Sequence, residues 1–284
     1  MAEVAMSVLT KTFEANRAIG DTLPAVLLLG GAINGFTVRI IESWQLAGAS
    51  SIFFGISPFE LIAIAVAAML YLEQLNDNNA QLSVSKIELG IPETLFLAAI
   101  LIPSSAASWL ATLLYAAFHA SRTQNNERTA ALLFVALSLC AIWSSIIMKW
   151  IAIPVTSFEA SIVWSVISTF RPDLTLDGNI IGIPDGHRIV LLIACTTAYG
   201  LPKALLGFTA ISIFLGTQIT SRFKIGMILA ALFYAFANLV RLVVMTWSDD
   251  AFHIAHGPIG TNIFDAATTL FIFLAAFLIS EKRI

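Results

Sequence analysis

Residues 225–247 read IGMILAALFYAFANLVRLVVMTW, and this stretch decides the fold class. At about 1.5 Å per residue it is long enough to cross the ~30 Å hydrocarbon core of a bilayer. Arg241 is its single charged side chain. The whole chain has the same character, since 58% of its 284 residues are hydrophobic and only 12% are charged. Soluble globular domains carry about 25% charged residues, so the sequence predicts an all-α polytopic membrane protein.

Further apolar runs predict other membrane-spanning helices along the chain. With the first stretch, the predicted spans are 22–42, 59–75, 92–119, 129–153, 195–216, 225–247 and 260–280. The run at 92–119 is longer than one straight span needs and contains Pro103, so it is either a kinked helix or a re-entrant pair. These alternatives give about seven or about eight spans.

Basic residues in short loops predict which helix ends face the cytoplasm. These residues are Arg122 and Arg128, Arg222 and Lys224, and Lys282 and Arg283 of the C-terminal tail. We therefore place the segments 154–194 and 248–258 outside, and the second of these contains no lysine or arginine. Seven spans would put Lys11 and Arg17 outside, against the rule, whereas eight would not. The side of the N-terminus stays open.

The N-terminal residues MAEVAMSVLTKTFEANRAIG carry charges and have no apolar core of the kind a secretory signal peptide needs. We expect an amphipathic helix on the membrane surface there. The net charge of -3, with no run of basic residues, gives no reason to expect a nucleic-acid partner.

The outward segment 154–194 is too polar to be a span. It begins with PVTSFEASIVWSVISTF, whose periodicity predicts a small helix at the membrane interface. It then continues with TLDGNIIGIPDGHRIVLLIAC, in which Pro184-Asp185-Gly186 is a turn signal between two β-branched runs. The pattern predicts a small hairpin whose second arm leads directly to Cys195.

Two cysteines occur at different predicted depths, which argues against a disulfide between them. Cys140 lies in the middle of a span and is predicted to be a small hydrophobic residue. Cys195 lies at the outer start of the next span, where water, charge and a helix N-terminus can reach it. It is either a packing residue or a nucleophile.

Three helix ends bring chemically useful side chains to the same predicted side of the membrane as Cys195. Arg241 lies six residues before Trp247, which places it about 9 Å from the outer end of its helix. Asn238 shares a helical face with Arg241 and is predicted to orient its guanidinium. The following loop carries His253 and His256.

Together these side chains are what thiol chemistry on an amide requires. The thiolate is the nucleophile, and a nearby cation and a helix N-terminus are expected to lower the pKa of the thiol. A histidine can take the thiol proton and return it to the leaving amine, and an arginine can hold the developing oxyanion. Each residue also has a simpler reading, because an arginine near a helix end can extend to the headgroups and a loop histidine is usually solvated.

Three short motifs appear in a fixed order. They are Cys195 in ACTTAYG, Asn238 to Arg241 in NLVR, and His256 to Gly260 in HGPIG. With the hairpin-like GNIIGIPDGHRIVLLIAC before the cysteine, they resemble the exosortase/archaeosortase family of multi-pass membrane transpeptidases over roughly residues 130–284.

The chain departs from that family's pattern at two places. Cys195 is followed by two threonines, where the family commonly has Cys-Ser-Gly. His253-x-x-x-Gly257 fits the last motif almost as well as the motif at His256, so the choice between the two histidines stays open.

The resemblance implies a membrane-embedded cysteine transpeptidase or protease that cleaves C-terminal sorting signals of exported proteins. A thioester intermediate would pass to an acceptor amine or lipid. It implies Cys195, Arg241 and His256 as catalytic residues with Asn238 and His253 in support, and no cofactor or metal. The partners would be the bilayer and a membrane-anchored exported protein with a sorting tail.

The resemblance further implies a location in the cell (inner or plasma) membrane with the active site on the extracytoplasmic side. It divides the chain into an N-terminal transmembrane region, 1–128, and a catalytic transmembrane region, 129–284. A transporter or a non-catalytic assembly factor is the alternative. Transporters tend to place polar groups at mid-membrane between internal repeats, whereas here they gather near one surface and no repeat is visible.

Overall fold

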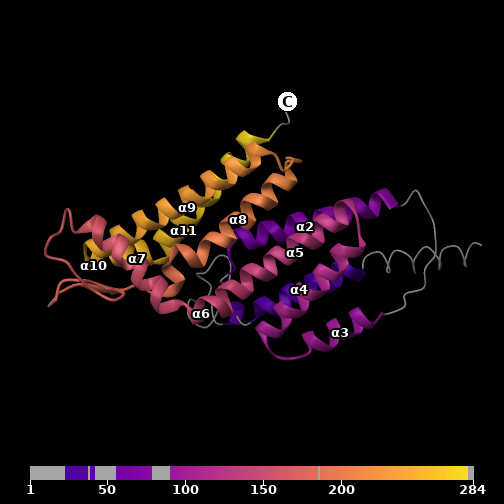
Figure 1. Cartoon of the computed structure of the whole chain (residues 1–284), viewed down its shortest axis with the longest axis horizontal. Coiled ribbons are helices and arrows are strands. Elements are labelled where there is room, and N and C mark those ends of the chain that lie inside the picture. The colour runs from indigo at the N-terminus through magenta and orange to yellow at the C-terminus, as the bar shows by residue number, and fades with distance from the viewer. Residues whose placement is uncertain (1–22, 38, 42–55, 79–89, 185, 281–284) are drawn as a thin grey trace, which may run out of the picture. The chain divides into compact units, whose positions relative to one another are not determined.

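The computed structural model describes residues 23–37, 39–41, 56–78, 90–184 and 186–280 (Figure 1). The N-terminal segment predicted to form a surface helix lies outside these residues, as do Lys282 and Arg283. The chain forms two compact units, which interleave in the sequence. Unit 1 is Met1–Ile40 with Ile64–Leu139, and unit 2 is Ile41–Ala63 with Cys140–Ile284.

Four helices are long and apolar enough to cross a membrane among the described residues. They are the helix Asn125–Trp150, α8 (Thr197–Phe214), α9 (Ser221–Trp247) and α11 (Pro258–Ile279). The protein is therefore a predominantly helical membrane protein, and these helices correspond to the predicted spans at 129–153, 195–216, 225–247 and 260–280. The helices Leu23–Thr37 and Ile91–Ile100 are apolar but shorter, so the total of seven to eight spans stays a prediction.

The predicted run at 92–119 is two helices. α3 (Ile91–Ile100) and α4 (Ser105–Arg122) are joined by a turn that contains Pro103, and they pack against each other. Ser104 caps α4, because its hydroxyl accepts a hydrogen bond from Ala107 N at 3.4 Å. Of the two alternatives that Pro103 left open, the structure shows a pair of helices.

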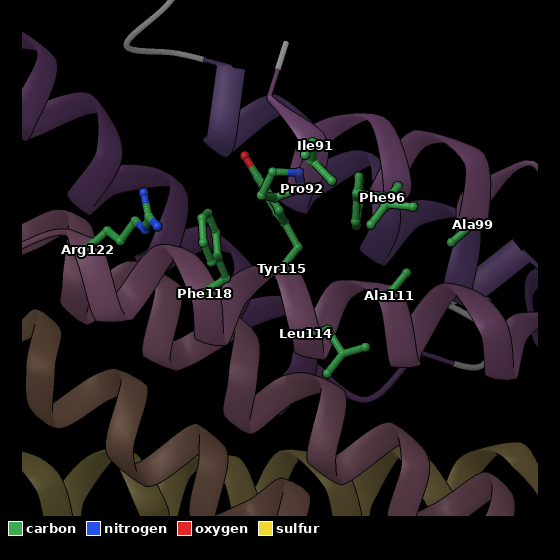
Figure 2. A pocket seen from close by; sticks show the side chains of 10 residues that line it. Ile91, Pro92, Phe96, Ala99, Ala111, Leu114, Tyr115, Phe118 and Arg122 are labelled. Atoms are coloured by element: carbon green, nitrogen blue, oxygen red, sulfur yellow. The ribbon is translucent and has the colours of Figure 1, made fainter.

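Unit 1 packs around Trp109 of α4, which is fully buried. The ring of Phe36 meets it edge to face at 4.8 Å. Asn34 donates one hydrogen bond to the carbonyl oxygen of Ile100 at the end of α3 and another to Ser108 at 2.7 Å. An apolar groove of about 670 Å³ lies between α3 and α4, with Arg122 beside Phe118 at one end (Figure 2).

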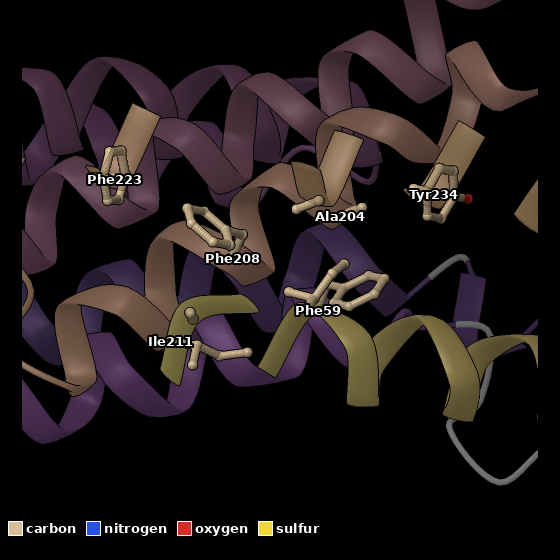
Figure 3. Packing of buried hydrophobic residues seen from close by; sticks show 9 residues of the cluster. Phe59, Ala204, Phe208, Ile211, Phe223 and Tyr234 are labelled. Atoms are coloured by element: carbon tan, nitrogen blue, oxygen red, sulfur yellow. The ribbon is translucent and has the colours of Figure 1, made fainter. Parts of the chain in front are cut away.

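In unit 2, α8, α9 and α11 pack side by side (Figure 1). α2 (Pro58–Asn78) begins in this unit and contributes Phe59 to the core. Phe59, Phe208 and Phe223 belong to this core together with small residues such as Ala204, which allow the helices to approach closely (Figure 3).

The helix Asn125–Trp150 is not uniform. It consists of α5 (Asn125–Ile142), a π-helical turn η2 (Trp143–Ile147) and α6 (Met148–Trp150). Ser145 donates to the carbonyl oxygen of Ala141 at 2.6 Å, a side-chain bond that competes with the regular helical ladder. The π-turn also lets Trp143 donate to the carbonyl oxygen of Ala198 in the first turn of α8 at 2.8 Å.

Within unit 2, the segment before α8 contains a helix and a small sheet. These are α7 (Ala152–Ile167) and an antiparallel sheet in the order β1 (Thr175–Asp177), β2 (Ile180–Gly182) and β3 (Arg188–Val190). The predicted hairpin around Pro184 is the β2–β3 pair, and sequence analysis missed β1. Ile181 and Ile189 are buried in one cluster with residues of α7 and α9, so the sheet is fixed by apolar packing against these helices.

Candidate active site

Cys195 ends a 3₁₀ turn, η3 (Ile193–Cys195), and Thr196 caps the helix that follows. The hydroxyl of Thr196 accepts a hydrogen bond from Tyr199 N at 3.3 Å and donates one to the carbonyl oxygen of Ile193 at 2.7 Å. The threonine that follows the cysteine therefore serves as the helix cap. Cys195 is half-buried at the N-terminal end of α8, where the sequence placed it.

Asn238 holds the backbone beside the thiol. It is buried in α9, and its Nδ2 donates to the carbonyl oxygen of Cys195 at 2.9 Å and to the hydroxyl of Thr197 at 3.1 Å. Its described hydrogen bonds go to this turn and to Glu159, and none goes to Arg241. The prediction that Asn238 orients the guanidinium is therefore wrong, although the two residues share one helical face as predicted.

Arg241 links α9 to the two elements that follow it. Its Nε donates to the carbonyl oxygen of Ala255 at 3.2 Å, and its Nη2 donates to the hydroxyl of Thr261 at 3.1 Å. The guanidinium also lies over the ring of Phe264 at 5.2 Å. Within the described part of the chain, Nη1 has no hydrogen-bond partner and no carboxylate forms an ion pair with Arg241.

The two candidate histidines lie on α10 (Asp249–His256) in different environments. His256 stacks on Phe252 with ring centroids 5.0 Å apart and lines a pocket of about 270 Å³ together with Cys195. His253 is 72% exposed, lies 3.5 Å from Asp249 and is not among the lining residues. The structure therefore brings Cys195 and His256 to one pocket and leaves His253 on the surface.

The glycine of the third motif has a steric reason. α11 starts directly after α10, and a Cβ at Gly260 would press against the carbonyl oxygen of Ile254 and lie 2.6 Å from Ala255 Cα. A side chain at this position would push the two helices apart. The Ala255 carbonyl in this same turn receives the hydrogen bond from Arg241, so the close approach also fixes the arginine.

The electrostatic balance at Cys195 differs from the sequence-based expectation. Burial raises the pKa of the thiol and is the largest effect. The positive charge of Arg241 lowers this pKa, while the negative charge of Glu159 raises it. The lowering effect expected of the cation is therefore present, but burial outweighs it, so the net direction of the pKa is upward and the protonated thiol is favoured at neutral pH.

Sequence analysis missed Glu159, a buried carboxylate on α7 with 8% exposure. Its Oε1 accepts a hydrogen bond from Thr197 N at 2.7 Å and another from Asn238 Nδ2 at 3.5 Å. A signal existed, because the buried stripe of α7 contains Thr156, Ala160 and Val163, and Glu159 is an acid within that stripe.

His187 was also missed. It lies in the loop between β2 and β3, with its Nε2 at 3.1 Å from the carbonyl oxygen of Met245 and its Nδ1 at 3.5 Å from Asp249. These contacts hold the hairpin, which supplies the pocket residues Arg188 and Leu191, against the outer end of α9 and the start of α10.

No group of three or more histidine, cysteine, aspartate or glutamate side chains suited to a metal ion occurs among the residues that the structure describes. The chemistry available at this site is therefore considered from the thiol, the imidazole, the guanidinium and the carboxylate. Comparison with known proteins adds no assignment, because no family model, no curated protein and no solved structure matches this chain.

Proposed function

We propose that this protein is a membrane-embedded cysteine transpeptidase or protease that cleaves the C-terminal sorting tail of membrane-anchored exported proteins on the extracytoplasmic side. One observation carries the proposal: Cys195 and His256 line the same pocket, although they lie on elements separated by α8 and α9. Arg241 supports it, because its charge acts on the thiol.

The roles of the three side chains follow from their chemistry. His256 takes the proton of Cys195, and the thiolate forms a bond to the scissile carbonyl carbon. Nη1 of Arg241 is available to hold the developing oxyanion. When the carbon–nitrogen bond breaks, the imidazolium returns the proton to the leaving amine, and a thioester on Cys195 remains. An acceptor amine, a lipid hydroxyl or water then releases the acyl group.

A protonated resting thiol fits this order of events. Because burial raises the pKa of Cys195, a free thiolate forms rarely, and attack requires proton transfer to His256 within the substrate complex. Substrate that excludes water from the pocket strengthens both the histidine–thiol interaction and the contribution of Arg241.

A neighbouring apolar groove is compatible with a membrane-anchored substrate. It has a volume of about 730 Å³ and lies between α7, α8 and α9, with Phe158, Leu201 and Phe236 in its lining. Thr197, which follows the cysteine turn, belongs to the same lining. An apolar segment of a substrate in this groove would therefore lie next to the nucleophile.

The test is to trap the thioester in cells. We expect an adduct between the protein and its substrate that survives denaturing electrophoresis and is released by hydroxylamine. It should disappear in Cys195→Ala and persist in Cys140→Ala, because Cys140 donates its only described hydrogen bond to the carbonyl oxygen of Pro202 inside the helix bundle. Substrate processing by Cys195→Ala would refute the proposal.

A transporter is the second candidate, and one observation favours it. Lys203 of α8 and Glu60 of α2 form a buried pair with 3.9 Å between Nζ and Oε1. Charged residues at such positions often belong to ion or proton pathways. However, Glu60 also accepts a hydrogen bond from Ser57 N at 2.9 Å, which is the capping-box geometry of a helix start. This second contact gives the pair a structural role, so we rank transport below acyl transfer.

A further inference from the structure

We propose that Glu159 is a positioning residue that holds the Cys195–Thr197 turn together with Asn238 and opposes the positive charge of Arg241 at the thiol. The inference rests on the proposed role of Cys195 as the nucleophile. It adds a residue on α7, a helix that contains none of the three motifs.

The first argument is the contact with α8. Glu159 Oε1 accepts the backbone hydrogen bond of Thr197, the first residue of this helix, at 2.7 Å. The first N–H groups of a helix have no partner within the helix, and a carboxylate there is also favoured by the helix dipole. Glu159 therefore fixes the residue that follows the cysteine turn, while Asn238 fixes the carbonyl oxygen of Cys195.

The second argument is the burial of the carboxylate. Glu159 is 8% exposed, and its described hydrogen bonds come from a backbone N–H and a neutral amide. No lysine, arginine or histidine forms an ion pair with it in the described part of the chain. A buried carboxylate is costly without a paired cation, so its presence needs a reason beyond packing.

The third argument is that two opposite charges act on the thiol. Arg241 favours the thiolate and Glu159 disfavours it. A thiolate that forms without substrate is open to oxidation and alkylation. Burial is the main cause of the raised pKa of the Cys195 thiol, and the carboxylate of Glu159 adds to it, whereas His256 can still remove the proton when substrate is bound.

The test measures alkylation of Cys195 by N-ethylmaleimide, a neutral reagent, in the full-length protein with Cys140→Ala as background. The rate is followed over a pH range that brackets about 8.5, the ordinary pKa of cysteine. Glu159→Gln keeps an oxygen that can accept the Thr197 hydrogen bond and removes the charge. We expect the pH midpoint to fall and the rate at neutral pH to rise about threefold or more, which corresponds to about half a pH unit.

Asp250→Asn is the matched control, because it removes one negative charge from an exposed position on α10. It should leave the midpoint unchanged. If Glu159→Gln alters the rate by the same factor at every pH, Glu159 only affects access to the sulfur and the electrostatic part is refuted. An unchanged profile refutes it as well.

Glu159→Asp tests the positioning part and remains useful if Glu159→Gln does not fold. The shorter side chain keeps the charge but withdraws the oxygen from Thr197, so we expect a nearly unchanged midpoint and substrate processing at least about tenfold slower. Normal processing by Glu159→Asp refutes the positioning role. Alkylation needs no substrate, so these results stand apart from the transpeptidase proposal, which fails separately if Cys195→Ala still processes substrate.

Discussion

Arg241→Lys separates a chemical role of this arginine from simple extension toward the headgroups. An arginine that only extends to the membrane surface needs a long stem and a positive charge, and lysine supplies both. In the structure the guanidinium is instead fixed inside the protein, by the carbonyl oxygen of Ala255, the hydroxyl of Thr261 and the ring of Phe264.

The size of the effect follows from these contacts. A lysine has one nitrogen and cannot donate to Ala255 and Thr261 in the same fork geometry and also supply the further N–H that we propose holds the oxyanion. Losing one hydrogen bond from a charged donor reduces the free energy of unfolding by about 1.5–3 kcal/mol. Losing a single oxyanion donor slows acyl transfer by about 100-fold or more. We therefore expect a folded, membrane-inserted variant with at least about 100-fold slower processing.

The assay is the rate of substrate processing at matched protein abundance, with membrane insertion checked in parallel. Arg222→Lys is the control, because Arg222 is exposed in the first turn of the same helix. Near-normal processing by Arg241→Lys would refute the oxyanion role and leave Cys195 without a defined electrostatic partner.

Three further predictions concern the histidines, the thiol and the buried ion pair. His256→Ala should abolish substrate processing and His253→Ala should reduce it at most a few-fold, because of these two histidines only His256 lines the pocket with the thiol. The opposite pattern would assign the role of the base to His253. Alkylation of Cys195 should be slow at pH 7, and its rate should increase with pH through a midpoint above the pKa of free cysteine, because burial raises the pKa of this thiol. A pH midpoint at or below the pKa of free cysteine would contradict the structure. Lys203→Met should lower the free energy of unfolding by about 3 kcal/mol, because it removes the cation that lies 3.9 Å from the buried carboxylate of Glu60, and the additional change Glu60→Gln should recover part of this loss in a thermal or denaturant unfolding assay.

The parts of the fold that could be predicted are those set by local sequence. A long apolar run specifies a membrane helix by itself, so four spans were located from the sequence alone. Pro103 marked the division between α3 and α4, and the turn at Pro184 marked the β2–β3 pair. β1 was missed although a signal existed, because Asp177-Gly178 at the turn between β1 and β2 is a common hairpin sequence and Gly178 has a φ of 59°.

The parts of the site that could not be predicted depend on contacts between distant segments. Helical spacing placed Asn238 and Arg241 on one face, yet the partners of Asn238 lie 41 and 43 positions earlier in the chain. Glu159 contacts Thr197 across 38 positions. A periodic pattern indicates which face of a helix is buried, but it does not indicate which residues that face meets.

The arrangement around Cys195 makes the thiol less reactive in the protein without substrate. A thiol intended to react freely would lie at a helix N-terminus with a cation and no carboxylate, so that its pKa falls. Here a buried carboxylate takes the first N–H of α8, and burial outweighs the effect of Arg241. In the proposed mechanism Cys195 therefore depends on His256 to remove its proton, and His256 lies on α10, whose end is fixed to α11 by the close approach at Gly260. It follows that changes which displace α10 should slow the chemical step even where Cys195, Arg241 and Glu159 are intact. Gly260→Val is such a change. A variant that inserts normally, is still alkylated at Cys195 and fails to process substrate would have the profile that this dependence requires. Normal processing by Gly260→Val would show that the position of α10 does not control the proton transfer.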